Sequence, residues 1–443
     1  MFTKTANIAV VGMGVSGNAT AKWLAKNGFA FSLHDSRAQL KLAPDVASLA
    51  KAVFLGEFKA EDFAGCAHIV LSPGLDPNTP FFQKLKKDGV HFSNDISLFG
   101  EVAQKPIIGI TGSNGKSTVT ALTGEILARA GMNVGVGGNL GTAALDLLDE
   151  DADAYVVELS SFQLEVAQNL PLHAATLLNL SPDHLDRHKT MSAYHACKQN
   201  IFACAQTAVV NREDPLSNPN RAMPKLYFGL DAPENAQGFG IKTHNGEAYL
   251  CAGEKPVLPV AKLKIQGQHN QLNALAAMAL SATLGVPTDV MAEVLAEFTG
   301  LPHRAQLVMC KNAITWINDS KGTNTGATLA TFAGLSANCE GKMILVLGGQ
   351  GKGEDYSVLQ TVVSQCRAVL LMGEEAPVIQ KAIASCAVPQ VACQNLSEVV
   401  QMAKHHAQPG DCVLFSPACT SLDMFENYKA RGDAFMECVK QNA

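Results

Sequence analysis

A glycine-rich stretch at residues 109–118, Gly-Ile-Thr-Gly-Ser-Asn-Gly-Lys-Ser-Thr, constrains the fold of this chain more than any other feature. It follows a short apolar run at 106–110 that is typical of a buried strand. It precedes residues 119–130, whose apolar side chains recur at helical spacing before Gly131. A strand, a glycine loop and a helix together form a phosphate cradle, because the loop amides turn inward and the helix N-terminus adds positive charge. The stretch therefore predicts nucleotide binding, with Lys116 reaching the terminal phosphates and Ser117 ligating Mg²⁺.

The glycine spacing differs from the general phosphate-loop pattern. Counting back from Gly115 and Lys116, that pattern expects a glycine where this chain has Ile110. A glycine-rich turn without a ligand is the alternative interpretation, and the flanking strand and helix favour the nucleotide.

Composition bounds the class of protein. The 443 residues suffice for two to four domains, and 47% apolar with 17% charged residues is typical of a globular chain. The net charge of −6 argues against nucleic acid or an anionic membrane as the main partner. The 12 cysteines include no Cys-x-x-Cys pair, which favours free thiols in a reducing compartment. Without a signal peptide or a membrane-length apolar run, we expect a cytoplasmic protein that does not enter a membrane.

Residues 1–97 predict a first α/β domain. A strand at 7–11 leads into Gly12-Met13-Gly14-Val15-Ser16-Gly17, and Asp35 closes a second strand. This is the dinucleotide fingerprint, although such a loop holds any pyrophosphate, so a nucleotide-sugar fits as well as NAD.

Residues 98–302 carry the phosphate loop and two further polar strand ends. Glu158 follows the strand at 154–157 and is a candidate Mg²⁺ partner, with a capping or solvated acid as the alternative. His184 follows the strand at 175–178, where an ordinary loop histidine is an equally good interpretation. Lys198 lies with Tyr194 on the apolar face of a predicted helix at 191–205. This pattern alone favours a snorkelling lysine over a reactive, desolvated amine.

The rest of the chain predicts hairpins, a hinge and a third α/β unit. Residues 227–265 are β-rich, and Asn245 and Gly246 are expected to form a hairpin turn. Asn270 and Asn273 are neighbours on the helix that follows, where such a pair either caps the helix or reads an adenine edge. Residues 301–304 resemble a hinge that places Arg304 toward phosphates. Residues 303–443 alternate strands with helices expected near 356–365, 376–385 and 396–407, and polar loops lie at 318–324, 348–353 and 416–422.

Taken together, these motifs resemble the Mur ligase family. The resemblance rests on residues 111–118, 158–165, 179–188, 267–270, 318–324 and 416–419, which occur in the family's order. It implies an α/β fold of three domains: an N-terminal Rossmann-like domain (1–97), a central phosphate-loop ATPase-type domain with a parallel sheet (98–302) and a C-terminal Rossmann-like domain (303–443). The glycine spacing of the loop is the family's own variant.

The resemblance also implies an activity: ATP-dependent addition of D-glutamate to UDP-N-acetylmuramoyl-L-alanine through an acyl phosphate, in cytoplasmic peptidoglycan synthesis. It implies ATP and two Mg²⁺ ions as cofactors, small-molecule substrates, no nucleic acid or membrane partner, and a monomer. The implied ATP-binding residues are Gly112, Ser113, Asn114, Gly115, Lys116, Ser117, Thr118, Asn270, Asn273, His303, Arg304 and Asp319. The implied metal ligands are Ser117, Glu158, His184 and Lys198, the last carbamylated; Lys116, Glu158, His184 and Lys198 are the catalytic set.

The same resemblance implies two substrate sites. The UDP-bearing substrate would be held by Val15, Ser16, Ser36, Arg37, Ser72 and Asn139. D-glutamate would be held by Lys321, Thr323, Lys352, Ser421, Leu422 and Tyr428. Two other classes stay open: a nicotinamide dehydrogenase that uses Asp35, and a nucleotide-driven switch or transporter subunit. Among ligases, folylpolyglutamate-type and diaminopimelate-adding enzymes are the runners-up, and the loop at 416–422 disfavours both.

Overall fold

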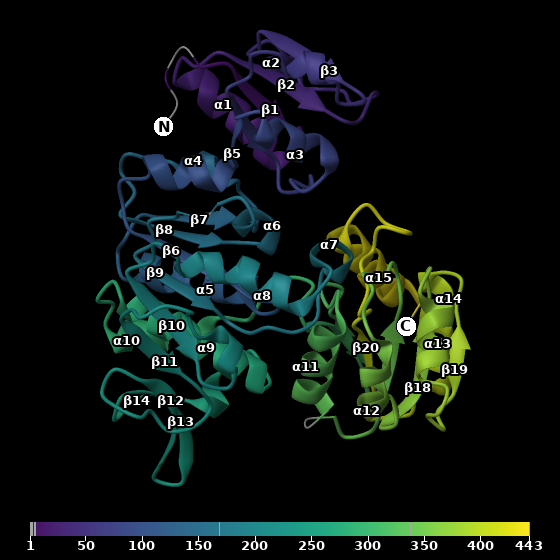
Figure 1. The fold of residues 1–443 in the computed structure, drawn as a ribbon. Helices are drawn as coiled ribbons and strands as arrows, with labels where there is room; N and C mark the ends of the chain where they lie inside the picture. Colours follow the sequence, from purple (N-terminus) through teal and green to yellow (C-terminus); the bar gives the residue numbers. More distant parts are fainter. Residues whose placement is uncertain (1–2, 4–5, 168, 337–338, 443) are drawn as a thin grey trace.

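The computed structural model describes residues 3, 6–167, 169–336 and 339–442. The described chain forms three β-sheets, each with helices against it, which confirms the α/β expectation (Figure 1). No helix in these residues has both the length and the apolar character needed to cross a lipid bilayer.

The first sheet has five parallel strands in the order β3-β2-β1-β4-β5. The strands are β1 (Ile8–Val11), β2 (Phe31–Asp35), β3 (Ala52–Leu55), β4 (His68–Leu71) and β5 (His91–Ser93); the helices are α1 (Val15–Lys26), α2 (Pro44–Ala47), η1 (Ala60–Phe63), α3 (Pro80–Lys87) and α4 (Asp95–Val102). The chain runs to opposite sides of β1, and ligands bind in such sheets at the crevice beyond the strand ends at this switch point.

The second sheet has nine strands in the order β14-β13-β12-β11-β10-β9-β6-β8-β7. Its strands are β6 (Ile107–Thr111), β7 (Val134–Gly138), β8 (Ala154–Glu158), β9 (Ala174–Leu177), β10 (Thr207–Asn211), β11 (Lys225–Phe228), β12 (Phe239–His244), β13 (Glu247–Ala252) and β14 (Lys255–Pro259). Its helices are α5 (Lys116–Arg129), η2 (Ala144–Leu147), α6 (Ser161–Leu164), α7 (Leu185–His188), α8 (Met191–Gln199), η3 (Asn200–Phe202), η4 (Pro215–Ser217), η5 (Val260–Lys262), α9 (Gln268–Ala282) and α10 (Thr288–Glu297).

Strands β12 to β14 are antiparallel and confirm the predicted hairpins. The turn between β12 and β13 holds Asn245 and Gly246 at φ 51° and 82°, as a type I′ hairpin turn requires. Strand β6 is buried on both faces, which explains its continuous apolar run. Helix α5 begins at Lys116, three residues before the predicted stretch, because Gly115 with φ 85° ends the loop.

The third sheet has the order β15-β16-β20-β17-β18-β19. Its strands are β15 (Gln306–Lys311), β16 (Ile314–Asn318), β17 (Met343–Leu347), β18 (Cys366–Leu371), β19 (Gln390–Ala392) and β20 (Cys412–Phe415); its helices are α11 (Thr325–Ser336), η6 (Tyr356–Leu359), α12 (Gln360–Val363), α13 (Ala376–Ala382), α14 (Leu396–His406) and α15 (Tyr428–Asn442). The first two strands form an antiparallel hairpin on an otherwise parallel sheet.

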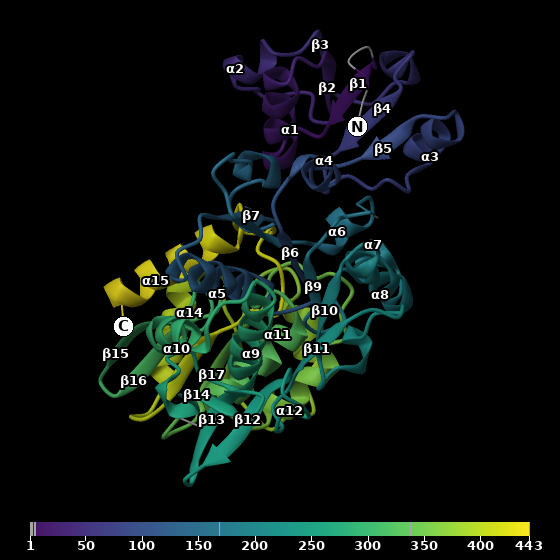
Figure 2. The same cartoon turned by 90° about the vertical axis from the view of Figure 1, so that its left-hand side faces the viewer.

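The three sheets and their helices form an N-terminal, a central and a C-terminal part (Figures 1 and 2). One continuous cluster of buried apolar side chains runs from the N-terminal part into the central part through α4, and the predicted boundary at residues 97 and 98 falls inside this helix. The C-terminal part has its own clusters on the two faces of its sheet. The loops after β6, β8 and β9 meet at one edge of the central sheet. This edge faces the C-terminal part, which the loops after β6 and β9 contact.

Candidate active site

The phosphate loop between β6 and α5 is held in place by its neighbour after β9. The amides of Ser113 and Asn114 donate to the main-chain and side-chain oxygens of Asn179, at 3.0 and 2.9 Å. Lys116 Nζ donates to the carbonyls of Gly112 and Ser113, at 2.8 and 2.9 Å. Burial lowers the pKa of Lys116, against the opposing effect of nearby carboxylates. The loop is therefore preorganised, and a phosphate would compete only with main-chain carbonyls for this lysine.

Glu158 ends β8 beside the loop and is buried. Its Oε1 accepts a 2.7 Å hydrogen bond from Asn139 Nδ2, whereas its buried Oε2 has no hydrogen-bond partner among the described residues. Burial alone would raise the pKa of Glu158, but Lys116, Arg304 and the Asn139 hydrogen bond act together in the opposite direction, and the net shift is downward. An ionised, half-satisfied buried carboxylate is suited to a cation.

Lys198 lies in the core rather than at the surface, with 1% of its area exposed. Its Nζ donates to Thr111 Oγ1 at 3.2 Å and to the Gly112 carbonyl at 2.9 Å. The snorkelling interpretation is therefore wrong, because the amine does not reach solvent. Burial, assisted by Lys116, lowers the pKa of Lys198 well below its usual value and favours the neutral amine.

His184 lies at the N-cap of α7 with φ 55°, a conformation that costs energy for any residue with a side chain. Its ring contacts Phe162, with the ring centres 4.8 Å apart. Burial lowers the pKa of His184 to about 4, so the ring is neutral near pH 7 and able to donate a lone pair.

The C-terminal part is closed onto the central part. Arg304 Nη2 donates to Ser117 Oγ at 2.7 Å, and the residues on either side, His303 and Ala305, both have positive φ. Asn324 and Asn114 exchange side-chain hydrogen bonds, at 3.2 and 3.4 Å. The junction predicted as a hinge therefore directs Arg304 at the start of α5.

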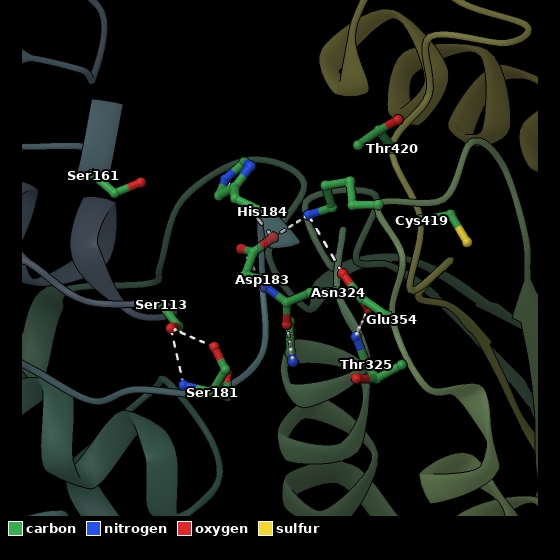
Figure 3. A network of polar contacts seen from close by, with 12 residues as sticks. Ser113, Ser161, Ser181, Asp183, His184, Asn324, Thr325, Glu354, Cys419 and Thr420 are labelled. Atoms are coloured by element: carbon green, nitrogen blue, oxygen red, sulfur yellow. Dashed lines mark hydrogen bonds and ion pairs between the residues drawn. The ribbon is translucent and has the colours of Figure 1, made fainter. Parts of the chain in front are cut away.

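A second set of cross-contacts surrounds Asp183, one residue before His184 (Figure 3). Lys352 forms an ion pair with Asp183 and lies 3.6 Å from Glu354 Oε1. Asn324 Nδ2 donates to Asp183 Oδ2 at 3.0 Å, and the Thr325 amide donates to Glu354 Oε2 at 2.9 Å. Burial alone would raise the pKa of Asp183, but Lys352 lowers it to about 2; burial raises the pKa of Glu354 to about 7.

Two adjoining clefts contain most of the predicted site. The first, about 220 Å³, includes Asn114, Gly115, Thr118, Asn270, Asn273, Arg304, Asp319 and Lys321 in its lining. The second, about 330 Å³, includes Ser113, Asn114, Gly115, Lys116, Asn139, Glu158, His184, Lys198, Arg304, Lys321, Thr323, Lys352, Ser421, Leu422 and Tyr428. Seven of the twelve predicted nucleotide residues therefore line the first cleft, and the second cleft contains the predicted catalytic and amino-acid residues.

Lys321 lines both clefts and lies with Nζ 4.2 Å from the centre of the Tyr428 ring. Burial and the nearby Arg304 lower the pKa of Lys321 to about 7. Asp319 is buried, and its carboxylate accepts from Ser416 Oγ at 2.7 Å and the Ala305 amide at 3.1 Å. Burial raises the pKa of Asp319 to about 6.

Three predicted nucleotide residues, Gly112, Ser117 and His303, line neither cleft. The first two belong to the phosphate loop and the start of α5. His303 instead turns into the C-terminal part, where its Nδ1 lies 3.0 Å from Asn318 Nδ2.

The predicted UDP-substrate residues lie around the crevice of the first sheet, except Asn139, which contacts Glu158. Val15 is 69% exposed, Ser36 and Arg37 are exposed, Ser16 is half-buried, and Ser72 donates to the Gly12 carbonyl at 2.5 Å. Asp35 is buried and accepts from the Met13 amide at 2.7 Å and from two guanidinium nitrogens of Arg37, both at 2.8 Å. This carboxylate holds its own loop together, so the acid on which a dehydrogenase interpretation depends is already engaged.

Sequence reasoning assigned no role to Asp183 and Asn324, which join the two parts, or to Glu354, which contacts Lys352 and Thr325 within the C-terminal part. Asp183 and Asn324 lie within the polar loops that follow strands, and this position could have marked them as site residues. Glu354 carries no pattern of its own, because its importance comes from burial beside Lys352.

Comparison with known proteins agrees along the length of the chain. Residues 6–93 match the family model for the Mur ligase MurD-like N-terminal domain, residues 110–281 match the Mur ligase middle domain, and residues 303–419 match the Mur ligase glutamate ligase domain. Two relatives named UDP-N-acetylmuramoylalanine–D-glutamate ligase are similar throughout. The one from Pseudomonas syringae is 45% identical with 97% of each chain covered, and the one from Pseudomonas aeruginosa is 44% identical with 98% of each covered.

Solved structures agree on the fold. A UDP-N-acetylmuramate-alanine ligase from Thermotoga maritima aligns with a TM-score of 0.62 at 18% identity, over 99% of this chain and 100% of the other. A MurF ligase from the same organism, in complex with ADP, aligns with a TM-score of 0.61 at 17% identity, over 99% and 96% of the two chains.

Proposed function

The chain belongs to the Mur ligase family, and on that premise we propose that it joins D-glutamate to UDP-N-acetylmuramoyl-L-alanine at the expense of ATP. The observation that carries the proposal is the second cleft, where the phosphate loop of the central part faces Lys352 and Ser421 of the C-terminal part. A reaction between a phosphorylated acid and an amino acid needs these two kinds of residue within reach of each other. Near-full-length similarity to two relatives named UDP-N-acetylmuramoylalanine–D-glutamate ligase supports the choice of substrates.

In the proposed reaction, the L-alanine carboxylate attacks the γ-phosphorus of ATP and forms an acyl phosphate with release of ADP. The neutral amine of D-glutamate then attacks the acyl carbon, phosphate leaves, and the nitrogen releases a proton as the amide forms. The first step brings two anions together, so the protein must neutralise charge and align the reactants. Lys116 and Arg304, both at the loop, are suited to neutralising the phosphates.

Magnesium is the proposed metal, with two ions. No cluster of three or more His, Cys, Asp or Glu side chains that could hold a metal occurs in the described ranges. Ligands of other kinds are therefore needed, and the Ser117 hydroxyl and a carbamate on Lys198 would supply them beside Glu158 and His184. The unpartnered Glu158 Oε2 and the neutral His184 ring fit this role. Bound magnesium would neutralise the phosphate and carboxylate oxygens during transfer.

The buried amine of Lys198 fits carbamylation. Only a neutral amine reacts with CO₂: an N–C bond forms, a proton is released, and the product is an anion with two oxygens. Among the described residues, the amine donates hydrogen bonds to Thr111 and Gly112, and neither acceptor is a carboxylate. A carbamate would therefore be stabilised by cations, which the site would contain when nucleotide and metal are bound.

The remaining parts of the proposal concern substrates and setting. Val15, Ser16, Ser36, Arg37, Ser72 and Asn139 would hold the UDP-bearing substrate, and Lys321, Thr323, Lys352, Ser421, Leu422 and Tyr428 would hold D-glutamate. We keep the domains at 1–97, 98–302 and 303–443 as a working division. We also propose a cytoplasmic monomer that has no nucleic acid or membrane partner.

A substrate-omission assay tests the function. Purified protein is incubated with ATP, Mg²⁺, UDP-N-acetylmuramoyl-L-alanine and D-glutamate, and the nucleotide-linked product is detected by mass spectrometry. We expect product only when all four are present, and little when L-glutamate replaces D-glutamate. ADP release without need of an amino acid would instead indicate a nucleotide switch, and an equal rate with L-glutamate would refute the proposed specificity.

A further inference from the structure

Arg431, in the first turn of α15, is almost completely buried, with 1% of its area exposed. Its guanidinium makes four hydrogen bonds. Nε donates to Ser320 Oγ at 3.0 Å, and Nη2 donates to the carbonyls of Ser320 and Cys419, at 2.8 and 3.1 Å. Nη1 donates to the carbonyl of Thr420 at 2.9 Å. All four acceptors are uncharged oxygens, so none of these hydrogen bonds is part of a salt bridge.

The acceptors belong to two loops, 318–324 and 416–422, and a third loop is attached to them. The Gln350 amide donates to the Thr420 carbonyl at 3.1 Å, and the Thr420 amide donates back at 2.9 Å. Gly349, with φ 136°, has no room for a side chain, because a Cβ would lie 2.1 Å from the Thr420 oxygen and 3.0 Å from Arg431 Nη1. The three loops therefore meet at one guanidinium.

Each of these loops carries residues of the proposed amino-acid site. Lys321 follows Ser320 directly, Ser421 follows Thr420 directly, and Lys352 is two residues beyond Gln350. All three line the second cleft, whereas Arg431 does not. On the basis of the proposed function, we propose that Arg431 is a positioning residue that sets the relative places of the three D-glutamate-binding loops.

The chemistry of the contact favours arginine over any other residue. A planar guanidinium presents five N–H donors in fixed directions and can join several acceptors at once. A lysine ammonium instead carries its donors on one nitrogen and acts as a point charge. Burial lowers the pKa of Arg431 to about 10, so the group remains charged at neutral pH. Because its acceptors are neutral, this charge also favours the binding of an amino acid with two carboxylates nearby.

The nucleotide site depends less on this residue. Asp319 shares the first loop, but its carboxylate is held by Ser416 and the Ala305 amide rather than by Arg431. Loss of the guanidinium should therefore weaken the binding of the amino acid far more than the binding of ATP. If Arg431 had a purely structural role, its loss would weaken the binding of all substrates together.

The test uses the full-length protein with Arg431→Ala and Arg431→Lys. We expect the KM for D-glutamate to rise by about 10- to 100-fold in both variants, in line with the cost of misplacing binding groups. Acyl-phosphate formation without amino acid, trapped by hydroxylamine, should stay within about threefold of wild type, because it precedes amino-acid binding. Millimolar guanidinium should restore part of the D-glutamate affinity of Arg431→Ala.

Arg367→Ala is the matched control. Arg367 pairs with the buried Asp411 in the same part of the chain, so its loss should lower the melting temperature without changing the KM for D-glutamate. An unchanged KM for D-glutamate in a folded Arg431→Lys would overturn the inference, as would an equal rise for all three substrates. If Arg431→Ala does not fold, the lysine variant decides alone. Failure of the proposed function is distinguishable, because wild-type protein would then form no amide product from D-glutamate or would release ADP without it.

Discussion

The ammonium of Lys352 is paired with the carboxylate of Asp183, and the two residues belong to opposite parts of the chain. Both side chains are buried, at 8% and 7% side-chain exposure. Lys352 is also a proposed ligand of D-glutamate, so the amino acid would have to displace Asp183 to reach it. The closed arrangement and the binding of the last substrate therefore depend on the same lysine.

Replacing Asp183 by Asn should loosen the contact between the central and C-terminal parts. Loss of a charged hydrogen bond costs about 1.5 kcal/mol, and that is roughly a tenfold change in the ratio of closed to open molecules. Small-angle X-ray scattering of the ligand-free variant should show a larger radius of gyration than wild type. Arg129→Ala, which breaks two exposed ion pairs within the central part, is the control and should leave the curve unchanged. Identical curves for wild type and Asp183→Asn would rule out this role of the ion pair.

Lys116→Ala should abolish amide formation while leaving the fold intact. The lysine donates only to carbonyls of its own loop, so its removal costs little stability, whereas the transferring phosphoryl group loses its cation. We expect a fall in kcat of about a thousandfold or more, as for other groups that stabilise developing charge. The product assay and circular dichroism measure the two effects separately. A variant that retains most of its rate would contradict the proposed phosphate site.

Lys198→Ala should be inactive and should regain part of its activity when acetate or formate is added. These carboxylates can enter the space left by the side chain and replace the proposed carbamate. Lys440→Ala, at the exposed end of α15, serves as the control and should neither lose activity nor respond to carboxylates. Full activity of Lys198→Arg, which cannot be carbamylated, would exclude the carbamate.

Asp35 should contribute to stability in a pH-dependent way. Burial would raise its pKa, but its hydrogen bonds with Arg37 and the Met13 amide lower it from 3.8 to about 2. Because the folded-state pKa is depressed, the contribution is fully present above about pH 4 and is lost as the pH falls toward 2. Asp35→Asn should therefore melt a few degrees below wild type at pH 7, with the difference shrinking between pH 4 and pH 2. Thermal unfolding at several pH values measures this, and a gap that widens on acidification would contradict it.

Several structural features could be predicted because they depend on local sequence. The phosphate loop, the strand before it and the helix after it follow from glycines and apolar spacing, and β6 and α5 lie at nearly the predicted residues. The hairpin turn at Asn245 and Gly246 could also be predicted, because this residue pair favours the positive φ angles that the turn requires. The face of α8 that carries Tyr194 and Lys198 was also predicted, and both side chains are buried.

Other features depend on contacts between distant residues and left no local pattern. The hairpin of β15 and β16 was not predicted, because its outer strand is half-exposed and lacks a clear alternation. A single helix was expected at 356–365, but the chain forms a 3₁₀ turn and a short helix before Cys366 enters β18. The state of Lys198 could not be read from helical spacing, since that spacing does not show what covers the end of the side chain.

The contact between Gly115 and Asn273 has a consequence for nucleotide choice. A Cβ on Gly115 would lie 2.4 Å from Asn273 Oδ1, so the side-chain amide of Asn273, on α9, packs directly against the main chain of the phosphate loop. If Asn273 reads the purine ring, the base and the phosphates are sensed by two surfaces that cannot move independently. We therefore expect that exchanging adenine for guanine would slow phosphoryl transfer as well as weaken binding, so that base selectivity appears in turnover and not in affinity alone.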